Sequence, residues 1–209
     1  MDDRRLFVLD LIEQHWCDPN PEQDPSAGGR LRVVINGTTL MDGESDDTGI
    51  ARTALAMSRT LLHDHTLGAP VAEQLVLHDC GFATTLGSCG IGANWWVRHE
   101  GDTVRIDGVI RFAETYGVLE GRSGYTTSDP TDMARYLLKH PHSGTAFPEA
   151  SCVVRYDDYA REVLALAHAA LDFAEGADKR FLDDFNRSEW LGWQTEIRET
   201  LASVAARAG

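Results

Sequence analysis

The chain has 209 residues, of which 43% are hydrophobic, enough to build the core of one domain of ordinary size. Its 33 acidic residues against 19 lysines and arginines give a formal net charge of −14, which disfavours binding to the phosphate backbone of nucleic acids. The start, MDDRRLFVLDLIEQHW, has charges throughout its apolar run and so fits neither a signal peptide nor a membrane span. We expect a cytoplasmic protein with free thiols.

A helix and a hairpin are predicted for the first part of the chain. Apolar residues recur at helical spacing over residues 6–16, which predicts a short first helix; these residues are Leu6, Leu9, Ile12 and Trp16. Residues 30–35 and 38–41 are predicted to be strands, because Asn36-Gly37 between them is a strong signal for a two-residue hairpin turn.

A second helix is predicted next, capped by Asp47 or Thr48 and packed on the sheet. Its apolar stripe comprises Ile50, Ala54, Met57 or Ser58, and Leu61, widened by Leu55 and Leu62. Residues 73–78 alternate weakly between apolar and polar, and residues 83–87 are their expected partner. Both are predicted as strands.

Residues 94–99 and 103–112 form the clearest pair of strands, joined by a turn at residues 100–102. The second strand alternates, with Val104, Ile106, Ile110 and Phe112 on one side and Arg105, Asp107 and Arg111 on the other. In the first strand Trp95 and Trp96 must point to opposite faces. We expect one of them to face away from the core unless another element covers it.

Residues 114–147 are predicted to form a long loop with a short helix at 131–139, and long loops of this kind are usually functional or mobile. A strand follows at 151–156, and Asp157 or Asp158 is expected to cap the next helix, whose apolar stripe comprises Tyr159, Val163, Leu166, Ala170 and Phe173. The last helix is predicted to begin at Ser188. Its stripe must be buried against the sheet or a second subunit, and comprises Trp190, Trp193, Ile197, Leu201 and Val204.

The candidate catalytic residues are His78, Cys80, Cys89 and His99. Thiolate and imidazole are ligands that zinc prefers, and an imidazole can also activate a cysteine nucleophile. However, these residues lack the C-x-x-C pairs of zinc ribbons and fingers, and no complete catalytic motif is present. We therefore predict no metal and no cofactor, and whether the protein is an enzyme stays undecided from the sequence.

The candidate binding residues are Asn94, Trp96 and Arg98, which share one face of their strand. A mixed aromatic and polar face is typical of an interface hot spot. We predict that Trp95 is the core residue and Trp96 the recognition residue. The alternative is that a helix of the same chain buries Trp96.

A resemblance is carried by three motifs: Cys80-Gly81, the segment GSCGIG at 87–92, and the Trp-x-Val-x-His pattern ending at His99. Together with the acidic and aromatic C-terminal part, they resemble a family of uncharacterised bacterial proteins of actinobacterial type. That family tends to carry proline where this chain has Gly90. The chain is also similar in general character to immunity proteins of bacterial toxin systems, which implies a protein partner.

These observations predict a single α+β domain spanning residues 1–209, with a mainly antiparallel sheet flanked by two or three helices and a helical C-terminus. The leading functional hypothesis is a small acidic cytosolic binding protein, an immunity-type or regulatory partner that neutralises a basic toxin or effector. One alternative is a small enzyme of bacterial secondary or amino-acid metabolism with a Cys/His-lined pocket. The other is a structural homodimer without a small-molecule site.

Overall fold

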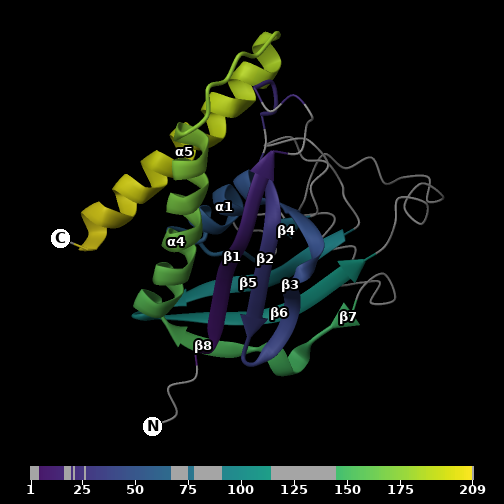
Figure 1. Ribbon diagram of the computed structural model, residues 1–209. Coiled ribbons are helices and arrows are strands. Elements are labelled where there is room, and N and C mark those ends of the chain that lie inside the picture. The colour runs from purple at the N-terminus through teal and green to yellow at the C-terminus, as the bar shows by residue number, and fades with distance from the viewer. Residues whose placement is uncertain are drawn as a thin grey trace, which may run out of the picture.

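The structure is a computed structural model that describes residues 5–16, 20, 22–25, 27–66, 75–77, 91–113 and 145–208. Within these ranges the chain forms two antiparallel sheets with helices packed against them (Figure 1). The predicted α+β class, with mainly antiparallel pairing and a helical C-terminal region, is confirmed. None of the described helices is both long enough and apolar enough to cross a membrane.

Some predicted elements cannot be placed in this fold. The strand expected at 83–87 and the short helix expected at 131–139 lie outside the described residues. The same holds for residues 114–144 of the long loop predicted for 114–147.

The first sheet has three strands in the order β1 (Phe7–Trp16), β2 (Ala27–Ile35) and β3 (Thr38–Gly49). Asn36 and Gly37 join β2 to β3, with φ angles of 49° and 80°. Positive φ at both central residues is what a type I′ hairpin turn requires, and asparagine followed by glycine meets this requirement with little strain. The predicted hairpin is therefore confirmed.

Residues 7–16 are a strand, so the predicted first helix is wrong. Phe7, Leu9 and Leu11 all contact the main core, which is the period-two pattern of a strand. Helix α4 (Tyr156–Glu175) covers the edge of β1, where the Leu9 N–H donates to the carboxylate of Glu162 at 3.2 Å. Pairing with β2 and this edge contact outweigh the helical spacing of the sequence, because tertiary contacts override weak local preferences.

The second sheet has five strands, and its strands run across those of the first (Figure 1). Both β7 (Thr145–Ala146) and β8 (Cys152–Arg155) pair with β6 (Thr103–Ala113), and the 3-10 helix η2 (Pro148–Ala150) separates them. The predicted hairpin of residues 94–99 and 103–112 is confirmed as β5 and β6. The strands are β4 (Val76–Leu77), β5 (Ile91–Glu100), β6 (Thr103–Ala113), β7 (Thr145–Ala146) and β8 (Cys152–Arg155).

A β-bulge interrupts the β5–β6 pair at Gly108. Asn94 lies opposite Ile110, whereas Trp96 lies opposite Asp107, so β6 has one extra residue between these two pairs. Gly108 adopts a φ of 59°, a conformation that favours glycine. The extra residue shifts the alternation, and Val109 joins the main core at the place where Ile110 was predicted.

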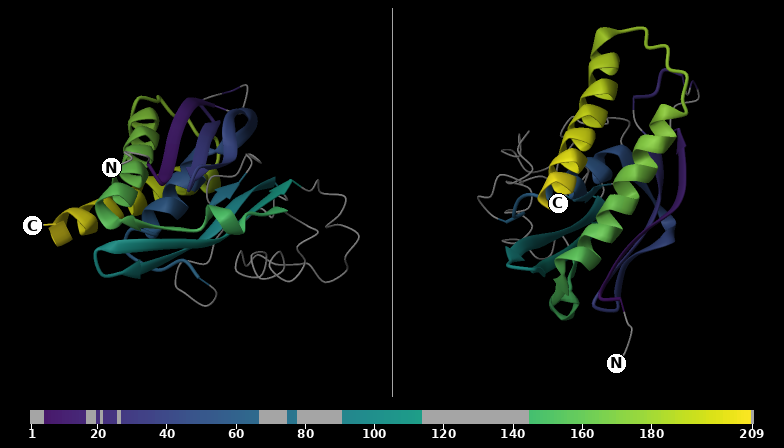
Figure 2. Two further views of the ribbon diagram at one scale, coloured as in Figure 1. Left: turned by 90° about the horizontal axis from the view of Figure 1, so that it is seen from below. Right: turned by 90° about the vertical axis from the view of Figure 1, so that its left-hand side faces the viewer.

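Three α-helices of the described residues pack around the sheets. Helix α1 (Ile50–Arg59) packs on β2 and contacts both α4 and α5 (Asp184–Ala208). Figure 2 shows α4 and α5 as an antiparallel pair outside the sheets. Every residue of the apolar stripes predicted for the three helices is buried or partly buried.

The predicted caps of α1 and α4 are wrong. Strand β3 continues to Gly49, which is the N-cap residue of α1, so that Asp47 and Thr48 belong to the strand. Helix α4 begins at Tyr156, which places Asp157 and Asp158 inside its first turn. Carboxylates there are still favourable, since they face the positive end of the helix dipole.

Helix α5 begins at Asp184, four residues before the predicted start at Ser188. The preceding Asp183 accepts a hydrogen bond from the backbone N–H of Asn186 at 2.7 Å. This contact is the N-cap interaction that aspartate favours, because it satisfies an N–H that has no partner inside the helix. The sequence therefore contained the correct start signal.

Candidate functional site

Three of the four predicted catalytic candidates, His78, Cys80 and Cys89, lie outside the described residues. Among the residues that the structure does describe, no group of three or more histidines, cysteines and acids is placed to hold a metal ion. Cys152 has a free thiol, and burial raises its pKa to about 11. A thiol with so high a pKa is almost entirely protonated at neutral pH and is a poor nucleophile.

Trp95 is fully buried, with its ring 6.0 Å from that of Phe7, so the prediction that Trp95 is the core residue is confirmed. Trp96 is only 7% exposed. Its ring lies 5.2 Å from that of His65, and a Cβ added at Gly108 would come within 2.3 Å of it. The tryptophan expected to face outward is therefore covered by its own chain, and a binding role for it stays a prediction.

Asn94 is buried beside Trp96, and Arg98 is on the surface. The Asn94 Oδ1 accepts hydrogen bonds from His65 Nε2 at 3.1 Å and from the Leu75 N–H at 3.2 Å. Arg98 forms an ion pair with Asp107. Of the three predicted binding residues, Asn94 and Trp96 are therefore buried and hold β5 to the neighbouring segments, whereas Arg98 is an exposed cation.

His99, the described member of the catalytic candidates, lies near the end of β5 and contacts Asp64. One oxygen of Asp64 is 2.9 Å from the His99 ring Nδ1 and 2.9 Å from its backbone nitrogen. Because a carboxylate accepts hydrogen bonds, Nδ1 carries the proton of this contact. Burial acts to raise the pKa of Asp64, but the hydrogen bonds from His99 outweigh it, and the pKa lies below its usual value.

This pair lines an open cavity of about 730 Å³ next to the C-terminal part of α5. The cavity is walled by four segments that are distant in sequence: residues 61–64, 99–101, 156–157 and 204–207. The Tyr156 hydroxyl donates to the Leu61 carbonyl oxygen at 3.1 Å, which fixes the ring against one wall. A cavity of this size can hold a small organic molecule.

The sequence did not reveal Asp64, Tyr156 or Arg207 as members of one site. Each belongs to a segment that has an ordinary structural role, and only the tertiary fold places them around the same cavity as His99. The only local signal was the cluster His63-Asp64-His65 just after α1.

A second candidate site lies where α4 connects to α5. Of the large hydrophobic side chains that the structure describes, the three most exposed fall within ten residues of one another: Leu182 is 82% exposed, Phe185 54% and Leu191 55%. Acidic residues stand between them in sequence, namely Asp183, Asp184 and Glu189. We call these six residues the acidic tip; Figure 1 shows the α4–α5 connection beyond the end of the three-stranded sheet.

Aromatic side chains support the acidic tip from inside. The Trp190 ring lies 5.6 Å from Trp16, 5.9 Å from Phe181 and 5.6 Å from Trp193. Phe173 packs on Trp16 at 4.5 Å. Aromatic pairs at these separations stabilise beyond the area they bury, so the start of α5 is firmly anchored.

Lys179 completes this anchor. Its Nζ lies 3.1 Å from the centre of the Trp16 ring and donates to the Asp24 carbonyl oxygen at 2.7 Å. Burial lowers the pKa of Lys179 to about 8, while the negative charges of Asp24 and Glu22 act in the opposite direction. The contact with the ring face also favours the charged form.

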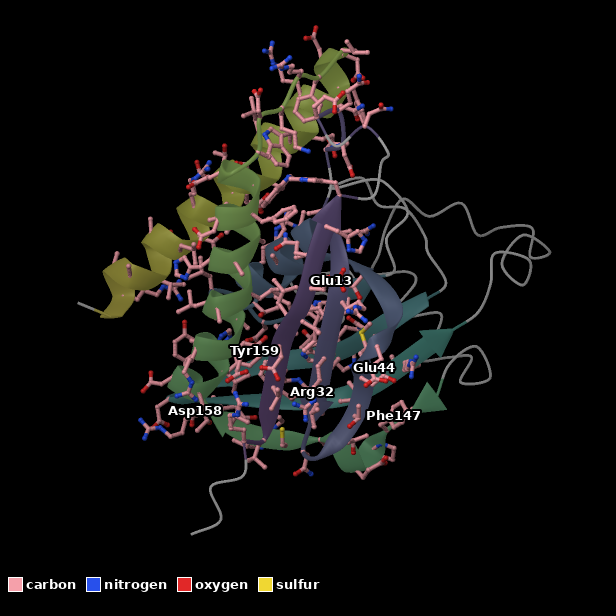
Figure 3. The ribbon with its side chains drawn as sticks, in the orientation of Figure 1. Glu13, Arg32, Glu44, Phe147, Asp158 and Tyr159 are labelled. Atoms are coloured by element: carbon pink, nitrogen blue, oxygen red, sulfur yellow. The ribbon has the colours of Figure 1, made fainter. Side chains whose placement is uncertain are left out.

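The outer side of the three-stranded sheet is a third charged surface. Figure 3 shows Glu13, Arg32 and Glu44 on this side of the sheet. Here Arg30 pairs with Glu13, and Arg32 lies 3.4 Å from Asp10. This surface therefore presents arginines as well as acids.

Comparisons with known proteins give no relative of this chain. No family model matches it, and no curated protein and no solved structure is significantly similar to it.

Proposed function

We propose that this protein is a small acidic binding protein of the cytosol, an immunity-type or regulatory partner that neutralises a basic protein target. The observation that carries the proposal is the acidic tip, where Leu182, Phe185 and Leu191 stand exposed among carboxylates. Clustered exposed apolar side chains with a polar rim are typical of protein interaction sites.

The charge of the tip specifies the chemistry of the partner. Asp183 and Asp184 are both exposed and lie between Leu182 and Phe185 in the chain. Together with the net charge of −14, they favour a cationic segment that also carries apolar side chains. Such a segment would place its apolar residues on Leu182 and Phe185 and its lysines or arginines beside the two aspartates.

The support beneath the tip favours binding. The aromatic rings of Trp16, Phe181 and Trp190 and the Lys179 hydrogen bond hold the chain on both sides of Leu182. The backbone N–H of Arg180 also donates to the Glu22 carbonyl oxygen at 2.8 Å. Because the site is already ordered, less conformational entropy is lost when a partner binds.

We expect a short lysine and leucine peptide with helical amphipathic spacing to bind the protein, and a double Leu182→Ser and Phe185→Ser variant to bind it at least about ten-fold more weakly. Asp184→Asn is expected to weaken binding chiefly at low salt, because exposed charges are screened at high ionic strength. The affinities can be measured by calorimetry at two salt concentrations.

The matched control is a double Ile12→Ser and Val153→Ser variant, since these two side chains are also exposed and apolar but lie on strands β1 and β8. It should bind the peptide like the wild type. Equal losses from the two double variants, or equal affinity for a scrambled peptide of the same composition, would rule out the tip as the binding surface.

A further inference from the structure

We propose that the cavity beside His99 is a second site, which binds a small organic anion with an aromatic or aliphatic body. It is walled by residues 61–64, 99–101, 156–157 and 204–207, far from the tip residues at the other end of α5. The proposal does not depend on the binding function of the acidic tip. It assigns a small-molecule class to the cavity from the side chains that line it.

The apolar part of the ligand is indicated by the walls. Leu61 and Val204, which line the cavity, are buried, and Leu62, also in its lining, is half-buried. The Tyr156 ring adds an aromatic wall, held in place by its hydrogen bond to the Leu61 carbonyl oxygen. Ligand cavities combine such apolar walls with a few polar groups that fix orientation.

The charge of the ligand can be inferred from the ionic groups of the cavity, because some of them already have partners within the protein. Asp64 accepts two hydrogen bonds from His99, and Asp157 lies 3.2 Å from Arg155. By contrast, no carboxylate of the described residues lies within ion-pair distance of Arg207. Arg207 thus presents a guanidinium without an ion-pair partner among the described residues, and a guanidinium binds carboxylates and related oxyanions with two parallel hydrogen bonds.

His99 supplies a further polar group. Its Nδ1 is held by Asp64, and its Nε2 is buried without a hydrogen-bond partner among the described residues. Buried polar atoms are rarely left unpaired, and an unpaired one often marks a place for a water molecule or a ligand. Because Nδ1 carries the proton, Nε2 of the neutral ring is an acceptor. We infer that it accepts a hydrogen bond from a water molecule that also donates to the bound anion.

Anilinonaphthalene sulfonate is a suitable probe because it is an aromatic anion whose fluorescence rises in apolar surroundings. It should be titrated into the Leu182→Ser and Phe185→Ser double variant, so that the acidic tip cannot contribute. In this background we expect Arg207→Glu to weaken binding about ten-fold or more, the loss of a charge-assisted contact. Arg187→Glu is the matched control, another exposed arginine of α5 with no ion pair among the described residues, and should leave the affinity unchanged.

Competition experiments identify the ligand class. We expect 1-naphthoate to displace the probe. The neutral 1-naphthalenemethanol lacks the charge, and inorganic phosphate lacks the apolar body. Each of these two should compete at least about ten-fold less well than 1-naphthoate. The His99→Asn variant keeps a donor for Asp64 but removes Nε2, and should weaken 1-naphthoate without unfolding the protein. Equal effects of Arg207→Glu and Arg187→Glu, or equal competition by the naphthoate and the alcohol, would overturn the proposal.

Discussion

Replacing Trp193 with alanine is expected to lower the free energy of unfolding by about 3 to 5 kcal/mol, the usual range when a buried tryptophan is truncated. Trp193 is 1% exposed and belongs to the main core. Its ring stands edge-on to Trp190 at 5.6 Å, so the truncation also removes an aromatic contact. Chemical denaturation of the two proteins measures the difference.

Two further variants show whether burial is the cause. Leu191→Ala changes an apolar residue of the same helix that is 55% exposed, and should cost less than about 0.5 kcal/mol. Trp193→Phe keeps an aromatic ring and removes an indole N–H that has no partner among the described residues, so it should cost clearly less than the alanine change. A Trp193→Ala protein with the stability of the wild type would contradict the packing of α5 on the core.

The second large effect is expected at Gly108, where an alanine should lower the free energy of unfolding by about 2 to 5 kcal/mol. A left-handed backbone costs an alanine about 1 to 2 kcal/mol, and overpacking adds about 1 to 3 kcal/mol. The clash is with Trp96, whose Cδ1 would lie 2.3 Å from the new Cβ. The bulge, the buried tryptophan and the glycine thus depend on one another.

Gly101→Ala is the matched control for this clash. Gly101 also has a positive φ, at 67°, but a Cβ added there meets nothing within 4 Å. The Gly101→Ala variant should therefore lose only the free energy that the positive φ costs an alanine. The additional loss of the Gly108→Ala variant should become smaller when Trp96 is also replaced by leucine. Identical losses from the two glycine variants would show that the Trp96 ring does not pack against the Gly108 backbone.

The sequence predicted those parts of the fold that local signals determine. Asn36-Gly37 encodes its own turn, and the alternation of residues 103–106 identifies β6. Residues 7–16 were misread because their apolar residues fit a helix and a strand equally well. Pairing with β2, about twenty residues away, decides between the two, and periodicity carries no information about such long-range contacts.

The candidate sites were less predictable for the same reason. His99 was identified from the chemistry of its side chain, but Asp64 and Arg207, which line the same cavity, come from segments distant in sequence. The bulge at Gly108 and the contact with His65 explain why Trp96 is buried, and strand alternation alone contains neither feature. The exposed residues Leu182 and Phe185 belong to no sequence motif, and their exposure is visible only in the folded chain.

The most direct test of the proposed function is to locate the binding surface by NMR, adding the lysine and leucine peptide to the isotope-labelled wild-type protein. We expect the largest shifts at Leu182, Phe185 and Leu191, with smaller changes at their acidic neighbours. Shifts concentrated on the outer side of the three-stranded sheet around Arg32, or in the cavity around His99, with the acidic tip unchanged, would contradict the proposed function.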